Sequence, residues 1–399
     1  MNVLIVNDTL GLSSTTDDHV IRAALALKSR GHEVDVAFQT RTSGGLSLAR
    51  SLFGRTLSLD AVANDSTTGT YDALYIVRVP DEKLLSRLPS GPRVVRMVLS
   101  HSLLYPKRTD YFTERSDAAH SALLGDKKGK VSSGDSFKSS GHARKVRKLN
   151  RTVDLFLAPS EFMRRELLRN GFKPNTVSVL APGVLLPGES ALEESPLAAA
   201  GLSELFLGDE ATAQAVPAMP RLLCVTELTR GRGVDSLMNA LAQLKNEEWY
   251  DALSVDVVGT GPGEASLREL SVALGLDSKV LFRGAVKRDY LDRLYERCKA
   301  LVIPSRYEEP NPEIALEAMA HGRPVIAYSV GAVPEWLRDR ETGLLVRPGD
   351  ESALAQAVSL MMLDTERANQ YGRAGRELAK ERFGFQRFAL DLENALRPR

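Results

Sequence analysis

A polar turn and the helix expected after it, residues 304–320, carry acidic side chains at a spacing that suits an elongated anionic ligand. Glu309 lies in the turn that follows an apolar run ending at Ile303, and Glu317 lies within the helix, two turns further on. Seven residues separate the two glutamates, so they cannot form the close carboxylate pair of a glycosidase. They can instead contact two parts of one ligand, on either side of its phosphates.

The start of this helix is a candidate anion site. Asn311 is a favourable N-cap and Pro312 suits the first helical turn. A helix that begins at the carboxyl end of a strand presents free backbone N–H groups and a partial positive charge, which suits a diphosphate. Acids near helix starts are common because they complement the helix dipole, so Glu309 and Glu313 alone indicate little. Glu317 is more informative because its neighbours are apolar.

The elements that must position these residues follow an alternating pattern. Short apolar runs bounded by Gly, Pro and Asp alternate with helical patterns, which is typical of parallel sheets covered by helices. In the first half the predicted strands are Val3–Val6, Val34–Phe38, Ala73–Val77, Val94–Val98, Leu155–Ala158 and Val177–Leu180, with a helix over Asp17–Ser29. In the second half they are Leu222–Thr226, Ser254–Val258, Val280–Phe282, Ala300–Ile303, Val325–Ala327 and Leu344–Val346.

Residues 186–220 interrupt this rhythm, because they are rich in Pro, Ala, Gly and Glu and lack strand character. The sequence therefore predicts an α/β protein with two Rossmann-like, doubly wound domains, residues 1–185 and 221–380, that face each other across a cleft at the carboxyl ends of both sheets. The tail from about Ser352 is expected to be helical with breaks around Gly372, Gly375 and Gly384. Residues 381–399 are expected to form a helix that packs back on the first domain.

Composition excludes several classes of protein. The 399 residues carry a formal net charge of +1, so no global field attracts nucleic acid, and zinc-finger or aromatic-basic signatures are missing from the sequence. The N-terminus MNVLIVND lacks the features of a signal peptide, and the sequence contains no apolar run long enough to span a membrane. We therefore expect a cytoplasmic protein. Cys224 and Cys298 are expected to be buried free thiols.

The segment Lys127–Lys148 has a composition of its own. It holds eight Lys or Arg residues and one acid, Asp135, interleaved with Ser and Gly. Such a composition cannot build a core, so a solvated insertion is the simpler interpretation. The alternative is a basic lid that touches an anionic acceptor or an anionic lipid surface, which would place the protein at the inner face of a membrane.

The motifs of the second half resemble those of a known family. Glu309, seven residues and then Glu317-Ala-Met-Ala-x-Gly-x-Pro-Val-Ile-Ala are similar to the signature of the retaining GT-B glycosyltransferases of family four, the glycosyl transferases of group 1. Further matches in order and spacing are SVDVVGTGP over 254–262, VLFRG over 280–284, Gly331-x-x-x-Glu335 and TGLLV-x-PGD over 342–350.

The resemblance implies roles for donor-binding residues. Glu317 would bind the ribose hydroxyls of a sugar nucleotide, and Glu309 would face the hydroxyls of the donor sugar near the reacting carbon. The implied contacts to the diphosphate, the glycine-rich turn and the base come from the backbone around Asn311, Pro312, Glu313 and Ile314, from Gly261, and from Arg283 and Val286.

A basic pair in this family neutralises the leaving diphosphate. The matching stretch is VTELTRGRGVDSL, in which Arg232 falls on the family's lysine while Glu227 occupies the position of its arginine. Arg230 lies three residues from Glu227, and two guanidinium groups can bind phosphate oxygens as well as Arg plus Lys can. We therefore expect Arg230 to take over the missing role.

The first half matches the family less closely. Gly11, within the stretch 10–14, occupies the place of a loop that approaches the donor phosphates, although members often have two glycines there. His101, shortly after the strand Val94–Val98, corresponds to a histidine that lines the catalytic cleft, and a polar residue in a surface loop is the alternative. The stretch Tyr105-Pro106-Lys107-Arg108 is expected to contact the acceptor.

The activity implied by the resemblance is a retaining, metal-independent transfer of a sugar from a UDP- or GDP-linked donor to an acceptor hydroxyl, without a cofactor. The expected catalytic residues are Glu309, His101 and Arg232. The acceptor would be a glycan, a lipid-linked glycan or a small molecule. Two alternatives stay open, namely a non-catalytic protein that binds sugar nucleotides and a GT-B epimerase that acts on the sugar nucleotide itself.

Overall fold

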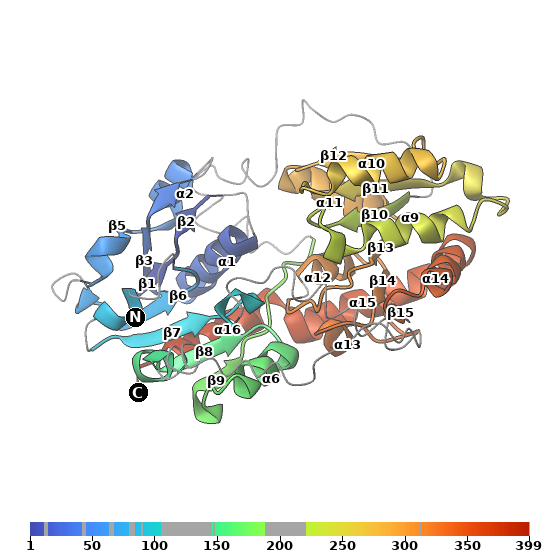
Figure 1. Cartoon of the computed structure of the whole chain (residues 1–399). Coiled ribbons are helices and arrows are strands. Elements are labelled where there is room, and N and C mark those ends of the chain that lie inside the picture. Colours follow the sequence, from blue (N-terminus) through green and yellow to red (C-terminus); the bar gives the residue numbers. More distant parts are fainter. Residues whose placement is uncertain are drawn as a thin grey trace.

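The computed structural model describes residues 1–11, 15–41, 45–63, 68–79, 84–88, 91–104, 146, 148–187, 221–311 and 313–398. These residues form two parallel sheets, each covered by helices (Figure 1). Both predicted series of strands are present, with end points that shift by one or two residues.

The first sheet has the order β5-β3-β1-β6-β7-β8-β9. Its strands are β1 (Asn2–Val6), β3 (Glu33–Phe38), β5 (Thr56–Ser58), β6 (Ala73–Ile76), β7 (Arg93–Met97), β8 (Leu155–Ala158) and β9 (Val177–Val179). A small parallel pair lies beside it, formed by β2 (Thr9–Leu10) and β4 (Thr40–Arg41). Strands β2, β4 and β5 were not predicted, since each has at most three residues and lacks an apolar run.

The second sheet has the order β12-β11-β10-β13-β14-β15. Its strands are β10 (Arg221–Val225), β11 (Ser254–Val258), β12 (Val280–Gly284), β13 (Ala300–Ile303), β14 (Val325–Tyr328) and β15 (Gly343–Val346). The chain runs from β10 outward in one direction and resumes on the other side of β10 with β13. The loops that follow β10 and β13 therefore flank the switch point of this sheet, where doubly wound folds bind ligands.

Helices cover both faces of the sheets. In the first domain they include α1 (Thr15–Ser29), α2 (Gly45–Leu52) and α6 (Glu161–Arg169). In the second they include α9 (Val234–Ala242), α10 (Glu264–Ala273), α11 (Arg288–Arg297), α12 (Glu313–Ala320), α13 (Val333–Trp336), α14 (Glu351–Leu363) and α15 (Thr365–Phe383), and the chain ends with α16 (Phe385–Leu396). The expected helix after β13 is α12, with Glu313 in its first turn and Leu316 and Met319 buried.

The prediction of breaks at Gly372 and Gly375 was wrong, because α15 runs unbroken through both residues. A Cβ atom on Gly372 would lie 2.0 Å from the carbonyl oxygen of Gly322, and one on Gly375 would lie 3.4 Å from the side chain of Met319. These glycines therefore let α15 approach α12 closely. The predicted break at Gly384 is confirmed, and a further break lies at Asp364, which caps α15.

Helix α16 belongs spatially to the first domain, although the second domain precedes it in the chain. Figure 1 shows it running back beneath the first sheet. Phe385, Phe388, Leu392 and Leu396 are buried in one cluster with residues of α1 and of β1, β3, β6 and β7. The N–H of Val184 donates to the carbonyl of Phe383 at 2.7 Å, so the chain crosses between the domains twice at neighbouring positions.

Cys224 and Cys298 are buried free thiols, as predicted. None of the helices that the structure describes is both long and apolar enough to cross a bilayer.

Candidate functional site

The loops after β10 and β13 are tied to each other by backbone hydrogen bonds. The carbonyl of Gly231 accepts from the N–H groups of Arg306 and Tyr307, at 2.9 and 3.0 Å. The guanidinium of Arg306 donates to the carbonyl of Arg230 at 2.6 Å and to the carboxylate of Asp235 at 3.0 Å. The short turn Arg230–Arg232 is therefore held from the side of the second loop.

Arg232 and Glu309, both predicted to be catalytic, form an ion pair across these two loops. The guanidinium of Arg232 also lies over the ring of Tyr307, 4.9 Å from its centroid. The charge of Glu309 raises the pKa of Arg232, and the charge of Glu227 acts in the same direction. Glu309 is itself positioned by its carbonyl, which accepts from the N–H of Ala332 at 2.8 Å.

His101 reaches the same cluster from the first domain. It begins a short 3-10 turn (His101–Leu103) after β7, and its Nδ1 lies 2.9 Å from the hydroxyl of Tyr307. Its ring makes an edge contact with that of Phe162. Burial lowers the pKa of His101 to about 4, so the imidazole is neutral at pH 7. The structure thus connects the three predicted catalytic residues through Tyr307, which sequence reasoning missed.

Glu317 lies at the boundary between the domains and is 5% exposed. Its Oε1 accepts from Arg22 of α1 at 2.7 Å and from Arg288 of α11 at 2.5 Å, and its Oε2 accepts from the hydroxyl of Tyr295 at 3.2 Å. Burial raises the pKa of this carboxyl, but Arg288 and Arg22 outweigh burial and lower the pKa to about 2. Sequence reasoning found none of these three partners.

The N-terminus of α12, the predicted diphosphate site, is of mixed charge. Glu313 is 6% exposed, and burial raises the pKa of its carboxyl. Burial likewise raises the pKa of Asp18. The charge of Arg22 lowers this pKa, and the charge of Glu317 raises it. The side chain of Asn311 lowers the pKa of Glu313, while the Oδ1 of Asn311, the predicted capping atom, has no hydrogen-bond partner among the described residues. An anion here would therefore meet both guanidinium groups and carboxyl groups.

The remaining predicted donor residues occupy several places. A Cβ atom on Gly261 would lie 2.5 Å from the carbonyl oxygen of Leu228, so the glycine-rich turn packs directly on the loop after β10. Arg230 is exposed. The side chain of Arg283 donates to Asp256 at 2.6 Å.

Other predicted residues lie away from the Arg232–Glu309 ion pair or outside the described residues. Val286 and Ile314 pack against the apolar cluster between α11, α12 and β13, and Gly11 is buried after β2. Outside the described residues lie the stretches 12–14, 105–108 and 127–145, together with Pro312 and Arg147. Among the residues with described side chains, no group of three or more His, Cys, Asp or Glu is arranged to hold a metal ion.

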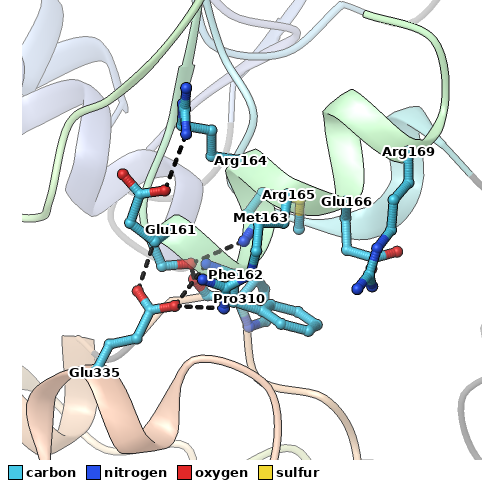
Figure 2. A network of polar contacts seen from close by, with 10 residues as sticks. Glu161, Phe162, Met163, Arg164, Arg165, Glu166, Arg169, Pro310 and Glu335 are labelled. Atoms are coloured by element: carbon cyan, nitrogen blue, oxygen red, sulfur yellow. Dashed lines mark hydrogen bonds and ion pairs between the residues drawn. The ribbon is translucent and has the colours of Figure 1, made fainter. Parts of the chain in front are cut away.

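A second contact between the domains lies at the start of α6 (Figure 2). The carboxylate of Glu335, on α13, accepts from the N–H groups of Glu161 and Phe162 at 2.8 and 2.6 Å and from Arg165 at 3.2 Å. Ser160 caps this helix and donates from its hydroxyl to the carbonyl of Pro310 at 2.8 Å. The turn that carries Glu309 is therefore held between α6 and α13.

Replacing Glu335 by Gln is expected to lower the free energy of unfolding by about 1–2 kcal/mol, because the first N–H groups of α6 lose an anionic acceptor. Urea denaturation measures the loss, and hydrogen exchange at Glu161 and Phe162 should accelerate. Glu161→Gln is the matched control. Among the described residues its carboxylate pairs with Arg164, one turn away, and it is half exposed, so a change below about 0.5 kcal/mol is expected. Equal losses in the two variants would contradict the role of Glu335.

Comparison with known proteins shows which family part of this chain resembles. Residues 214–378 match the family described as glycosyl transferases group 1. A GDP-mannose-dependent alpha-(1-6)-phosphatidylinositol monomannoside mannosyltransferase of Mycobacterium tuberculosis is 30% identical over 184 residues, which are 45% of this chain and 47% of that protein. A D-inositol 3-phosphate glycosyltransferase of Streptomyces bingchenggensis is 31% identical over 245 residues, 59% of this chain and 51% of that protein. The chain thus spans about half the length of the curated relatives it matches.

Solved structures agree with this chain over nearly its whole length. Anabaena HepE in complex with UDP-glucose superposes with a TM-score of 0.70 at 18% identity and covers 99% of both chains. TarM superposes with a TM-score of 0.71 at 10% identity and covers 99% of this chain and 98% of its own. The predicted GT-B fold and the resemblance to the glycosyl transferases of group 1 are confirmed.

Proposed function

We propose that this protein transfers a sugar from a nucleotide-diphosphate sugar to an acceptor hydroxyl, since residues 214–378 match the glycosyl transferases of group 1. The observation that carries the proposal is the ion pair of Arg232 and Glu309, on the two loops that flank the switch point of the second sheet. His101 reaches the same place from the first domain. A donor bound by the second domain would therefore present its sugar to an acceptor on the first.

In this proposal the ribose binds Glu317 through Oε2, which accepts from Tyr295, since Oε1 already accepts from both Arg22 and Arg288. The diphosphate lies near the start of α12, where Arg232 and Arg230 oppose its charge. The base contacts the backbone near Arg283 and Val286. Arg232 would then exchange part of its contact with Glu309 for a phosphate oxygen, which frees Glu309 to accept from a sugar hydroxyl.

The proposed chemistry is retaining and independent of metal. The bond between C1 and the phosphate oxygen breaks through an oxocarbenium-like state, and its electron pair stays on the diphosphate. Arg232, Arg230 and the helix start stabilise that developing charge. The acceptor oxygen then forms the new bond on the face that the leaving group left, and its proton passes to the departing phosphate. No general base of the protein is required for this step.

The donor class is the first property to measure. Titration calorimetry with UDP, GDP and their glucose and mannose esters is expected to show binding of one base class to the wild type. Incubation with that donor and a panel of glycans, inositol phosphates and glycolipids should then yield a glycosylated product. Release of free sugar or of an epimer, without transfer, would favour a GT-B epimerase instead.

Replacing Arg232 by Gln is expected to lower kcat for transfer about 10²- to 10³-fold, because charge on the leaving diphosphate loses its main partner. The KM for the donor should change far less. Steady-state kinetics checks both values. Arg230→Gln tests whether that residue replaces the arginine missing at Glu227: a comparable loss of kcat supports the exchange, and an unchanged kcat excludes it.

A second function is favoured by one observation. Glu227 stands where the family carries an arginine, and its negative charge raises the pKa of Arg232. A protein that binds sugar nucleotides without turnover would tolerate this reversal of charge. Donor binding in calorimetry, with no product from any acceptor and no slow hydrolysis, would support that function over transfer.

A further inference from the structure

Tyr307 joins groups from both domains that the proposed reaction uses. Its hydroxyl lies 2.9 Å from Nδ1 of His101, and the two rings make a T-shaped contact with centroids 5.6 Å apart. On its other side the guanidinium of Arg232 lies 4.9 Å from the ring centroid. The backbone N–H of Tyr307 donates to the carbonyl of Gly231 at 3.0 Å, so the residue is fixed at its main chain as well.

The protonation states on the two sides of this contact are set by their surroundings. Burial lowers the pKa of His101 to about 4, and burial together with the charge of Glu309 raises the pKa of Tyr307. At pH 7 a neutral imidazole therefore meets an un-ionised phenol. A phenol is a better donor than acceptor, and an imidazole nitrogen is a strong acceptor, so the bond runs from the Tyr307 hydroxyl to Nδ1 of His101. The single imidazole proton is then on Nε2, because the bond made by one ring nitrogen decides which nitrogen carries the proton.

We propose that Tyr307 is a positioning residue that holds His101 in the Nε2–H tautomer and in a fixed ring orientation. Its catalytic consequence rests on the proposed function: His101 would present an N–H donor toward the donor sugar and the reacting carbon. His101 comes from the first domain and Tyr307 from the second, so the tautomer is set only when the two domains are in contact. Tyr307 therefore lets His101 act as an Nε2–H donor only when both domains form the site.

The alternative is that Tyr307 serves only as a platform for Arg232. Two variants separate these roles. Tyr307→Phe keeps the ring beneath the guanidinium and removes the hydroxyl, whereas Tyr307→Leu removes both. Tyr290→Phe is the matched control, because Tyr290 also lies beneath an arginine, Arg293, at 5.8 Å.

The direct test is ¹⁵N spectroscopy of the whole protein labelled at histidine, with His101 assigned through the variant His101→Gln. In the wild type, Nδ1 of His101 is expected at the shift of an unprotonated acceptor nitrogen and Nε2 at that of a protonated one. Tyr307→Phe should give averaged shifts of two tautomers, and Tyr290→Phe should give the wild-type pattern. Identical His101 shifts in Tyr307→Phe and wild type, or a wild-type proton on Nδ1, would overturn the proposal.

Kinetics supplies a second readout once a donor and an acceptor are known. Loss of the hydroxyl is expected to lower kcat about 5- to 10-fold with an unchanged KM for the donor, as the loss of one hydrogen bond allows. The double variant with His101→Gln should be no slower than His101→Gln alone, because Tyr307 acts through His101. Additive losses would assign Tyr307 a role apart from His101. A wild type without any transfer would refute the proposed function, while the ¹⁵N test would still decide the tautomer.

Discussion

Replacing Glu317 by Gln is expected to lower the free energy of unfolding by about 3 kcal/mol, since it leaves two guanidinium groups at the domain boundary without their carboxylate. Arg22 and Arg288 both donate to Oε1 of Glu317, and the side chain of Arg22 is 15% exposed. The side chain of Arg288 is 33% exposed, which places the loss at the low end of the range for buried pairs. Urea denaturation at pH 7 measures it.

The same substitution should also change the pH dependence of stability. The folded-state pKa of Glu317 is lowered from 4.5 to about 2, so its contribution is fully present above pH 4.5 and is lost as the pH falls toward 2. The difference between wild type and Glu317→Gln is therefore expected to shrink between pH 5 and pH 2.5. Glu381→Gln, on the exposed side of α15, is the control and should leave stability nearly unchanged at every pH. A difference that does not depend on pH would contradict the charge argument.

Glu317→Gln is also expected to weaken binding of the sugar nucleotide, because an amide is a poorer acceptor for ribose hydroxyls than a carboxylate. Calorimetry at pH 7, where the variant remains folded, separates this effect from the loss of stability. Wild-type affinity in a folded variant would show that Glu317 is only a structural link between α1, α11 and α12.

Replacing Gly233 by Ala is expected to destabilise the second domain by about 3 kcal/mol or more. Gly233 has φ +71°, and an added Cβ would lie 1.9 Å from the carbonyl oxygen of Pro304. The methyl group would therefore force apart the loops after β10 and β13. Because Arg232 precedes Gly233 directly, its ion pair with Glu309 should be displaced, and transfer activity should fall with stability.

Gly275→Ala isolates the contribution of the backbone angle. Gly275 has φ +64°, similar to Gly233, but an added Cβ would meet only the flexible Nζ of Lys245, at 3.8 Å. Its expected cost is about 1 kcal/mol, that of a left-handed residue without a clash. Comparable thermal and urea midpoints for the two variants would show that the loops near Pro304 yield to an extra methyl group.

The sequence by itself determined the elements and much of the site's outline. Apolar runs between turn residues located the strands of both sheets, because a parallel strand buried on both faces must be apolar throughout. The helix after β13 was predictable from residues 311–320, since capping and an apolar stripe are local properties. Glu309, Arg232 and His101 were predicted from their places in matched motifs, and the structure brings them into one cluster.

Local patterns failed where packing decides. Strands β2, β4 and β5 are too short to carry a signal of their own, and they exist because neighbouring elements place backbone groups beside them. The glycines of α15 resembled helix breaks, yet they are sites where the turn after α12 and the side chain of Met319 come close. A glycine lowers helix propensity in either case, so only the neighbour distinguishes the two.

The tertiary structure alone decided which charges and hydrogen bonds meet. Arg22 and Glu317 are 295 residues apart in the chain, His101 and Tyr307 are 206 apart, and Glu161 and Glu335 are 174 apart. Nothing in the composition near Arg22 or Glu161 indicates these partners, because an exposed charge on a helix has the same local pattern as a paired one. These partners are determined when the two domains pack together. Burial then makes an unpaired charge or N–H group costly, so the arrangement in which each group has a partner is the stable one.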